Sequence, residues 1–185
     1  KVYEWDGSNW TQKGDDIIGT DASYFGYNVA LNSDGNRISI ISNNLSGDKK
    51  KVYVFEYNLE TNSWVILGSS IEINDAWNPD YNVDISHLDI SSDGETIAFR
   101  SNNGSDICVE VYAWDNGKSL WNQKINESAI IPDTGVTSID NIRISINGNE
   151  VGFNYSKNSN FYTVVYRSII LNSNLVWSQH GNKIN

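Results

Sequence analysis

The sequence predicts an all-β protein built from repeated four-stranded antiparallel units, and three observations support this prediction. An aromatic strand pattern and a tryptophan recur about every 55 residues, and an Asp-Gly or Asn-Gly step lies between successive copies. Valine, isoleucine, threonine and aromatic residues dominate the segments of alternating polarity, as pleated strands prefer. Repeated four-stranded units are typical of β-propeller blades, which pack around a common axis. We therefore expect about three and a half blades in this chain.

The first repeated element is an aromatic strand followed by a polar turn and a tryptophan-led strand. The aromatic strand occurs at Val2–Trp5, Val52–Phe55, Val111–Trp114 and, more loosely, Val164–Arg167. The tryptophans that follow these segments are Trp10, Trp64, Trp121 and Trp177. Because a large ring repeated once per unit suits a shared core, we expect these four residues to pack between blades at equivalent positions.

The second repeated element is a tight turn between two alternating apolar segments. It occurs at Asp34-Gly35, Asp93-Gly94 and Asn147-Gly148. Such dipeptides favour the positive φ of hairpin turns, so each one predicts an antiparallel strand pair. We expect turn chemistry rather than metal ligation from these side chains.

The two elements together divide the chain into units. In the first complete unit the strands are expected near residues 27–32, 37–42, 51–57 and 63–68. We expect a half blade with its linker at 1–26, then blades at 27–82, 83–138 and 139–185. Pro79 and Pro132 lie in the links between units, where a missing amide donor does least harm. Because three and a half blades do not close a ring, we expect further blades from the same longer chain or from another subunit.

The first 50 residues resemble the FG-GAP-type, integrin α-like propeller repeats. Trp10–Gly19 followed by Phe25–Gly35 carries the likeness, and Trp177–Ile184 repeats its Trp-x-Gln-x-Gly-x-x-Ile pattern. The two middle units lose the Phe-Gly pair, and Ile40–Asn44 stands where the Gly-Ala-Pro half would be. The resemblance implies a seven-bladed propeller that serves adhesion or ligand binding outside the cell.

Calcium-binding members of that family carry several alternating carboxylates in the loop between the first two strands. The corresponding loops here, Asn32–Gly35 and Ser91–Gly94, contain one carboxylate each. Calcium takes six to eight oxygen ligands, usually with several carboxylates among them. We therefore predict no metal and no cofactor.

No catalytic constellation stands out in the sequence. Ser91–Ile97 looks similar to the Asp box of sialidase-like propellers, but its Asp and Gly are adjacent. His87 and His180 lack the spacing of a zinc site and are expected on turns or the surface, and Cys108 is expected to be a buried, inert thiol. We predict that the chain is not an enzyme. The alternative is a sialidase-like or other glycoside hydrolase whose catalytic residues lie partly outside this chain.

Four arginines, Arg37, Arg100, Arg143 and Arg167, fall on or beside the expected strands. A cluster of them that binds a substrate carboxylate is a minor alternative. The acidic residues near the links between blades are expected to form a solvated rim, although a carboxylate pair could hydrolyse glycosides at a suitable separation. A cation could bind incidentally among Asp75, Asp80 and Asp84.

One tryptophan breaks the period. Trp77 stands in a link beside Asp75, Asp80 and Tyr81. Loop aromatics among polar groups are typical of surfaces that stack on sugar rings, so these four residues are the candidate ligand site. We expect a protein or glycan surface ligand.

Charge and hydropathy narrow the classes of partner. The formal net charge of −10 makes nucleic acid and anionic membranes poor partners. No apolar run reaches the roughly 18 residues of a membrane helix, so we expect no membrane insertion. The sequence therefore predicts an acidic, non-enzymatic interaction or structural module, located outside the cell or on the surface of a cell or particle.

Overall fold

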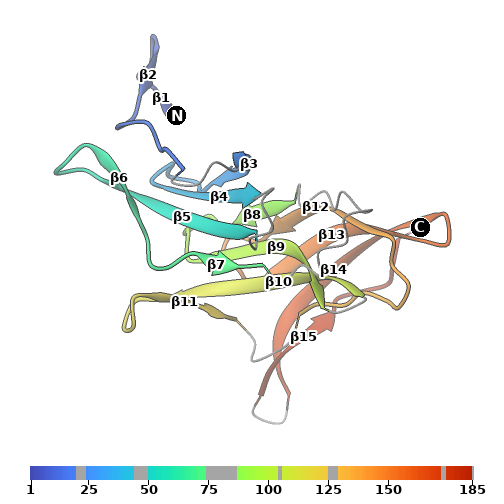
Figure 1. Cartoon of the computed structure of the whole chain (residues 1–185). Coiled ribbons are helices and arrows are strands. Elements are labelled where there is room, and N and C mark those ends of the chain that lie inside the picture. The colour runs from blue at the N-terminus through green and yellow to red at the C-terminus, as the bar shows by residue number, and fades with distance from the viewer. Residues whose placement is uncertain are drawn as a thin grey trace.

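The computed structural model describes residues 1–19, 24–43, 50–73, 87–103, 106–124, 129–171 and 174–184. In this part of the chain the regular elements are β-strands, arranged as antiparallel sheets that follow one another in chain order (Figure 1). The first sheet is a hairpin of β1 (Tyr3–Trp5) and β2 (Trp10–Gln12), which we call the N-terminal hairpin. No helical segment among these residues has the length and apolar character that a membrane crossing requires.

Three four-stranded meanders follow the N-terminal hairpin, and we call them the first, second and third blades. The first blade contains β3 (Tyr24–Leu31), β4 (Arg37–Asn43), β5 (Lys51–Asn58) and β6 (Ser63–Ile66), and β7 (Ile71–Glu72) returns to pair with β5. The second blade contains β8 (Leu88–Ile90), β9 (Thr96–Asn103), β10 (Asp106–Asp115) and β11 (Leu120–Gln123). The third blade contains β12 (Ser138–Ile144), β13 (Glu150–Lys157), β14 (Asn160–Leu171) and β15 (Asn174–Gln179). The chain is thus all-β, with a half blade and three propeller blades.

Backbone hydrogen bonds fix which residues of the repeats are equivalent. In each sheet one amide near the end of the outer strand donates to a valine of the preceding strand: Lys13 to Val2 (2.9 Å), Leu67 to Val54 (2.7 Å), Lys124 to Val111 (2.7 Å) and His180 to Val165 (2.7 Å). The residues equivalent to Val2 are therefore Val54, Val111 and Val165. The sequence alignment had matched Val2 to Val52, which is wrong by two residues, and to Val164, which is wrong by one. Val52–Phe55 alternates with a period of two, so a shift of two residues leaves its apolar face unchanged.

The three Gly-containing turns connect the first two strands of each blade. The glycines adopt the left-handed φ that the turns require, at +58° for Gly35, +74° for Gly94 and +65° for Gly148. Oδ1 of Asp93 accepts the amide hydrogen of Glu95 (2.9 Å), and Oδ1 of Asn147 accepts that of Asn149 (3.1 Å). These side chains are therefore engaged within their own turns.

The apolar core lies between blades rather than within one sheet. One buried cluster joins the first and second blades and includes Ile41, Val54, Ile97 and Phe99. A second cluster joins the second and third blades and includes Val109, Ile139 and Phe153. Cys108 is fully buried, and burial raises the pKa of its thiol to about 12. Each blade is therefore stabilised by its neighbour, as stacked repeats are.

The four tryptophans that recur once per repeat lie on the outermost strand of each sheet, namely Trp10 on β2, Trp64 on β6, Trp121 on β11 and Trp177 on β15. Nε1 of Trp64 donates to the carbonyl of Lys13 (2.7 Å), and Nε1 of Trp121 donates to the carbonyl of Leu67 (3.0 Å). Both acceptors occupy the same repeat position in the preceding sheet. Trp10 is 67% exposed and packs on Trp5 (ring centroids 5.6 Å apart) instead of on a preceding sheet.

Candidate functional site

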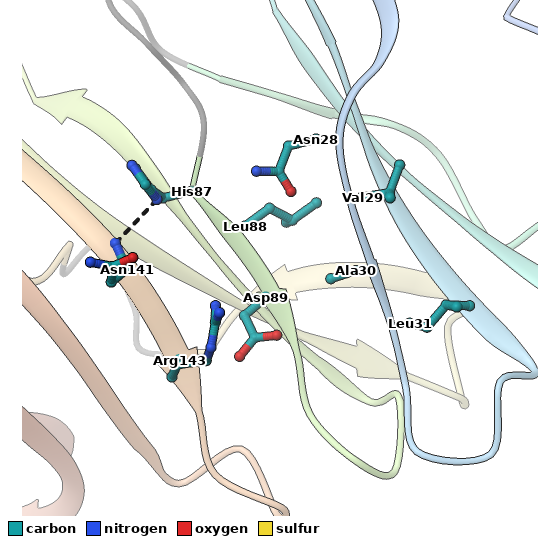
Figure 2. A pocket seen from close by; sticks show the side chains of 9 residues that line it. All are labelled: Asn28, Val29, Ala30, Leu31, His87, Leu88, Asp89, Asn141 and Arg143. Atoms are coloured by element: carbon teal, nitrogen blue, oxygen red, sulfur yellow. Dashed lines mark hydrogen bonds between the residues drawn. The ribbon is translucent and has the colours of Figure 1, made fainter.

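The first strands of the three blades lie next to one another and line a polar groove with a volume of about 360 Å³ (Figure 2). Its lining residues are Asn28, Val29, Ala30 and Leu31 on β3, His87, Leu88 and Asp89 at β8, and Asn141 and Arg143 on β12. Figure 2 shows the side chains of Asn28 and Ala30 directed toward the groove, whereas those of Val29 and Leu31 point away from it. The groove is therefore formed by one face of each inner strand.

Irregularities in β3 and β12 aim polar side chains into the groove. The register of β3 shifts between Phe25 and Asn28, where Gly26 has φ +87°, and that of β12 shifts between Asp140 and Arg143. Within the second shift Asn141 has φ +51°, a left-handed conformation that asparagine tolerates better than most residues. Bulges of this kind redirect side chains and are common beside functional sites.

His87 connects β8 to β12. Its Nδ1 accepts the amide hydrogen of Asn141 (3.1 Å), and its Nε2 lies 3.1 Å from Oδ1 of Asp140 (Figure 2 draws the first contact). Because Nδ1 is an acceptor, the proton of the neutral ring is on Nε2 and is donated to Asp140. The imidazole thus orients the bulge of β12, and both of its nitrogens are occupied by this role.

Asp89 and Arg143 supply the two opposite charges of the groove. Oδ2 of Asp89 accepts the amide hydrogen of Ile144 (2.9 Å), which ties the second blade to the third. Nη1 of Arg143 donates to the carbonyl of Ile142 (2.8 Å), while its guanidinium extends into the groove (Figure 2). A guanidinium has five N–H donors, and a carboxylate has two acceptor oxygens. Both groups therefore retain hydrogen-bonding capacity for a ligand.

The groove combines donors and acceptors over a small area. Asn28 and Asn141 add amide groups to the carboxylate of Asp89 and the guanidinium of Arg143. A few convergent polar groups in a pocket of several hundred cubic ångströms suit a small ligand with several hydroxyl groups. Among the described residues, no group of three or more His, Cys, Asp and Glu side chains is placed to hold a metal ion.

The predicted sugar-stacking residues Trp77, Asp75, Asp80 and Tyr81 fall within 74–86, outside the described residues, as does Asp84. Their role stays a prediction. In the sequence this segment leads directly into His87, the first groove residue of the second blade.

The arginine cluster considered in the sequence does not form. Arg37 pairs with Glu56 across β4 and β5 (2.8 Å), and Arg167 pairs with Glu150 across β13 and β14. Arg100 is buried in β9, which leaves Arg143 as the arginine that lines the groove. His87, which was expected on a turn or the surface, lies just before β8 with its side chain 20% exposed, and its imidazole contacts β12.

Sequence reasoning missed most groove residues, although a repeat signal for them exists. Counting back from the first residue of each turn, Asn32, Ser91 and Ser145, places Asn28, His87 and Asn141 at one equivalent position. Ala30, Asp89 and Arg143 fall at a second equivalent position. Polar residues at five of these six matching positions are therefore the signal that could have located the groove.

No family model matches the chain, and no curated protein matches it. Solved structures do resemble it. A protein from Lactobacillus plantarum is 17% identical over 93% of this chain and 46% of its own, with a TM-score of 0.49. A Bacteroides uniformis chain proposed to be a 6-phosphogluconolactonase is 15% identical over 92% and 45% of the two chains, also with a TM-score of 0.49. The Pseudomonas aeruginosa periplasmic gluconolactonase PpgL is 19% identical over 82% and 39%, with a TM-score of 0.47.

This chain spans less than half the length of these three structures. Two of them are named as lactonases, so the sequence-based prediction that the chain is not an enzyme is wrong on this finding and is withdrawn. At such low identity the names describe those proteins only. None of the three is named as an FG-GAP or integrin protein, and that finer resemblance stays a prediction.

Proposed function

We propose that this chain is a ligand-binding β-propeller module whose site is the groove across β3, β8 and β12. The observation that carries the proposal is the convergence of Asn28, Asp89, Asn141 and Arg143 from three different blades. Each residue alone would be an ordinary surface group. These residues occupy two equivalent positions on the first strands of the three blades, and their proximity in one groove favours a binding site.

The ligand that fits this chemistry best is a glycan with neighbouring hydroxyl groups. A hydroxyl group both donates and accepts, so one diol can donate to Asp89 and accept from Arg143. A neutral ligand also avoids the repulsion that a chain with a formal net charge of −10 exerts on anions. The volume of about 360 Å³ suits one or two sugar rings better than the flat surface of a protein.

The setting we propose is outside the cell or on the surface of a cell or particle, where glycans are displayed. The resemblance of the first 50 residues to FG-GAP-type repeats supports this setting. The predicted stacking residue Trp77 stands ten residues before His87 in the sequence, and an aromatic residue among polar groups is typical of surfaces that bind sugars.

Hydrolysis in the same groove is a second candidate, favoured by the carboxylate of Asp89. One oxygen of Asp89 is held by the amide of Ile144, and the other is available to a bound sugar. Glycoside hydrolysis needs a second carboxylate at a suitable separation, and Asp89 is the one carboxylate among the groove residues described here. Binding is therefore the better-supported function.

Binding to an immobilised glycan array, with the affinity of each hit then measured in solution, tests the proposal. We expect Asp89→Asn and Arg143→Ala each to weaken binding of the hit about tenfold or more. Asn can still accept the hydrogen of Ile144 through its amide oxygen, so the loss reports the charge of Asp89 and its second acceptor oxygen. The matched control is Lys118→Ala, which also removes one positive charge but lies on an exposed turn.

Equal affinity of the native protein and both groove variants would overturn the assignment of the site. Release of free sugar from a bound glycan, abolished in Asp89→Asn, would favour the hydrolytic candidate instead.

A further inference from the structure

His87 is the histidine that lines the groove, and its side chain lies between the second and third blades (Figure 2). Its Nδ1 accepts the amide hydrogen of Asn141 (3.1 Å), and its Nε2 lies 3.1 Å from Oδ1 of Asp140. The two contacts favour different protonation states of the ring. The amide of Asn141 needs an unprotonated Nδ1, whereas the carboxylate of Asp140 stabilises a positively charged ring.

The amide of Asn141 belongs to the bulge of β12. The register of β12 against β13 shifts between Asp140 and Arg143, and Asn141 falls inside this shift. Its amide donates to His87 in the neighbouring blade. Its backbone is left-handed, with φ +51°, which is less favourable than right-handed backbone for any residue other than glycine. The conformation of the bulge therefore depends on an acceptor that the second blade supplies.

The residues on either side of Asn141 are held by other contacts. Oδ2 of Asp140 accepts the hydroxyl hydrogen of Ser138 (3.0 Å), and Ile142 is 1% exposed in the core between the second and third blades. Asn141 itself is exposed, so its amide can bond to water if His87 releases it. A change at His87 can therefore move Asn141 without unfolding the third blade.

Protonation of His87 removes the acceptor of the Asn141 amide. The second proton of the imidazolium resides on Nδ1, so two N–H groups would then point at each other. The carboxylate of Asp140 already contacts Nε2 and stabilises the cation in this position. Histidines change their charge between pH 5 and 8, which places this event in mild acid.

Other charged groups lie around the ring. Asp89 and Arg143 line the same groove with opposite charges, and the amide of Arg100 on β9 donates to the carbonyl of this histidine (3.1 Å). Asp84 precedes the histidine by three residues in the sequence and lies outside the described residues. Among the described carboxylates, that of Asp140 is paired with the ring. The contacts that sense the charge of the ring directly are therefore those with β12.

We propose that protonation of His87 in mild acid releases the bulge of β12, turns Asn141 out of the groove and thereby weakens glycan binding. The inference rests on the proposed function, because it concerns the regulation of that same site. Asn141 contributes a side-chain amide to the groove, so its displacement removes one donor and one acceptor from a bound sugar. At neutral pH the uncharged ring restores the acceptor and, with it, the binding conformation.

The affinity for the glycan hit, measured at pH 7.5 and at pH 5.0, tests this switch. We expect the native protein to bind at least about fivefold more weakly at pH 5.0, since about one hydrogen bond to the ligand is lost. In His87→Asn the amide oxygen can accept from Asn141 at either pH, so the ratio of the two affinities should approach one. The matched control is His180→Asn, which removes the other histidine of the sequence, an exposed residue after β15, and should keep the native ratio.

An NMR titration of the free protein gives a second readout that needs no glycan. The amide proton and nitrogen of Asn141 should shift with the same midpoint as the Cε1 proton of His87. An Asn141 amide that does not follow His87 would overturn the proposal. So would a pH dependence of binding that His87→Asn retains, because the titrating group would then be another one, such as Asp89.

Failure of the switch is distinguishable from failure of the proposed function. Glycan binding at pH 7.5 that is unchanged at pH 5.0 would retain the binding site and refute the switch. Absence of any glycan hit at pH 7.5 would refute the proposed ligand. If the amide of Asn141 still followed His87 in that case, the coupling of this histidine to the groove would stand.

Discussion

Alanine at the glycine of the turn between the first two strands of a blade should cost more stability where the preceding blade lies against that turn than where no atom lies close to it. Gly148 and Gly35 form a matched pair because both have left-handed φ, at +65° and +58°. The backbone strain of alanine there is about 1–2 kcal/mol at either position. At Gly148 the new Cβ would also lie 2.5 Å from Cβ of Thr96, and overpacking of this kind costs about 1–3 kcal/mol.

The free energy of unfolding in urea, compared between the native protein and both variants, measures this difference. We expect Gly148→Ala to lose about 2–5 kcal/mol and Gly35→Ala about 1–2 kcal/mol, because no atom lies within 4 Å of the Cβ position at Gly35. A parallel Gly94→Ala variant should lose an amount between the two, since its Cβ would meet Cδ of the flexible Arg37 side chain (2.7 Å), which can move more easily than the Cβ of Thr96. Equal losses at Gly35 and Gly148 would show that the packing of Thr96 in the second blade against the turn at Gly148 contributes nothing to the cost.

Three further predictions follow from the same contacts. Trp121→Phe should lower the free energy of unfolding by about 1–3 kcal/mol, since it leaves the carbonyl of Leu67 without its donor. Trp10→Phe should change it by less than about 0.5 kcal/mol, because Trp10 is 67% exposed; urea unfolding of both variants checks the pair. Burial raises the pKa of Cys108 to about 12, so its thiol should resist iodoacetamide at pH 8 until the protein unfolds. Because the folded pKa lies above the unfolded value, the contribution of Cys108 to stability should be present below pH 9.0 and decline as the pH rises toward about 12. Hydrogen bonds from Lys157 and then Lys183 lower the pKa of Asp133 to about 2. The contribution of Asp133 should therefore be present above pH 3.8 and be lost as the pH falls through about 2, and an NMR titration of its carboxyl carbon should show the low midpoint.

Local chemistry made much of the fold predictable from the sequence. The Asp-Gly and Asn-Gly steps imply positive φ and hence hairpins, and each of the three lies in the turn between the first two strands of a blade. The alignment of the aromatic strands was less accurate, because Val52–Phe55 alternates and a two-residue shift preserves its pattern. The hydrogen bond between Leu67 and Val54, which decides the register, is a contact between strands that residue types do not specify.

The candidate site was harder to predict than the fold. Asn28, Asp89 and Asn141 are separated by more than fifty residues along the chain, and each alone is an ordinary polar residue of a short strand. The stacking of blades brings them to one groove, and this depends on contacts between sheets. The packing role expected for Trp10 depended on a preceding sheet in the same way, and its high exposure shows why a repeat position alone does not determine burial.

An NMR titration of the isotope-labelled protein with the glycan that binds most tightly tests whether the groove across the three blades is the binding site. We predict that chemical-shift changes concentrate at the side-chain amides of Asn28 and Asn141 and at Nε of Arg143, with smaller changes at the backbone of β8. Changes confined to the exposed residues Trp5 and Trp10, or spread evenly over the surface, would contradict it and would place binding away from the inner strands.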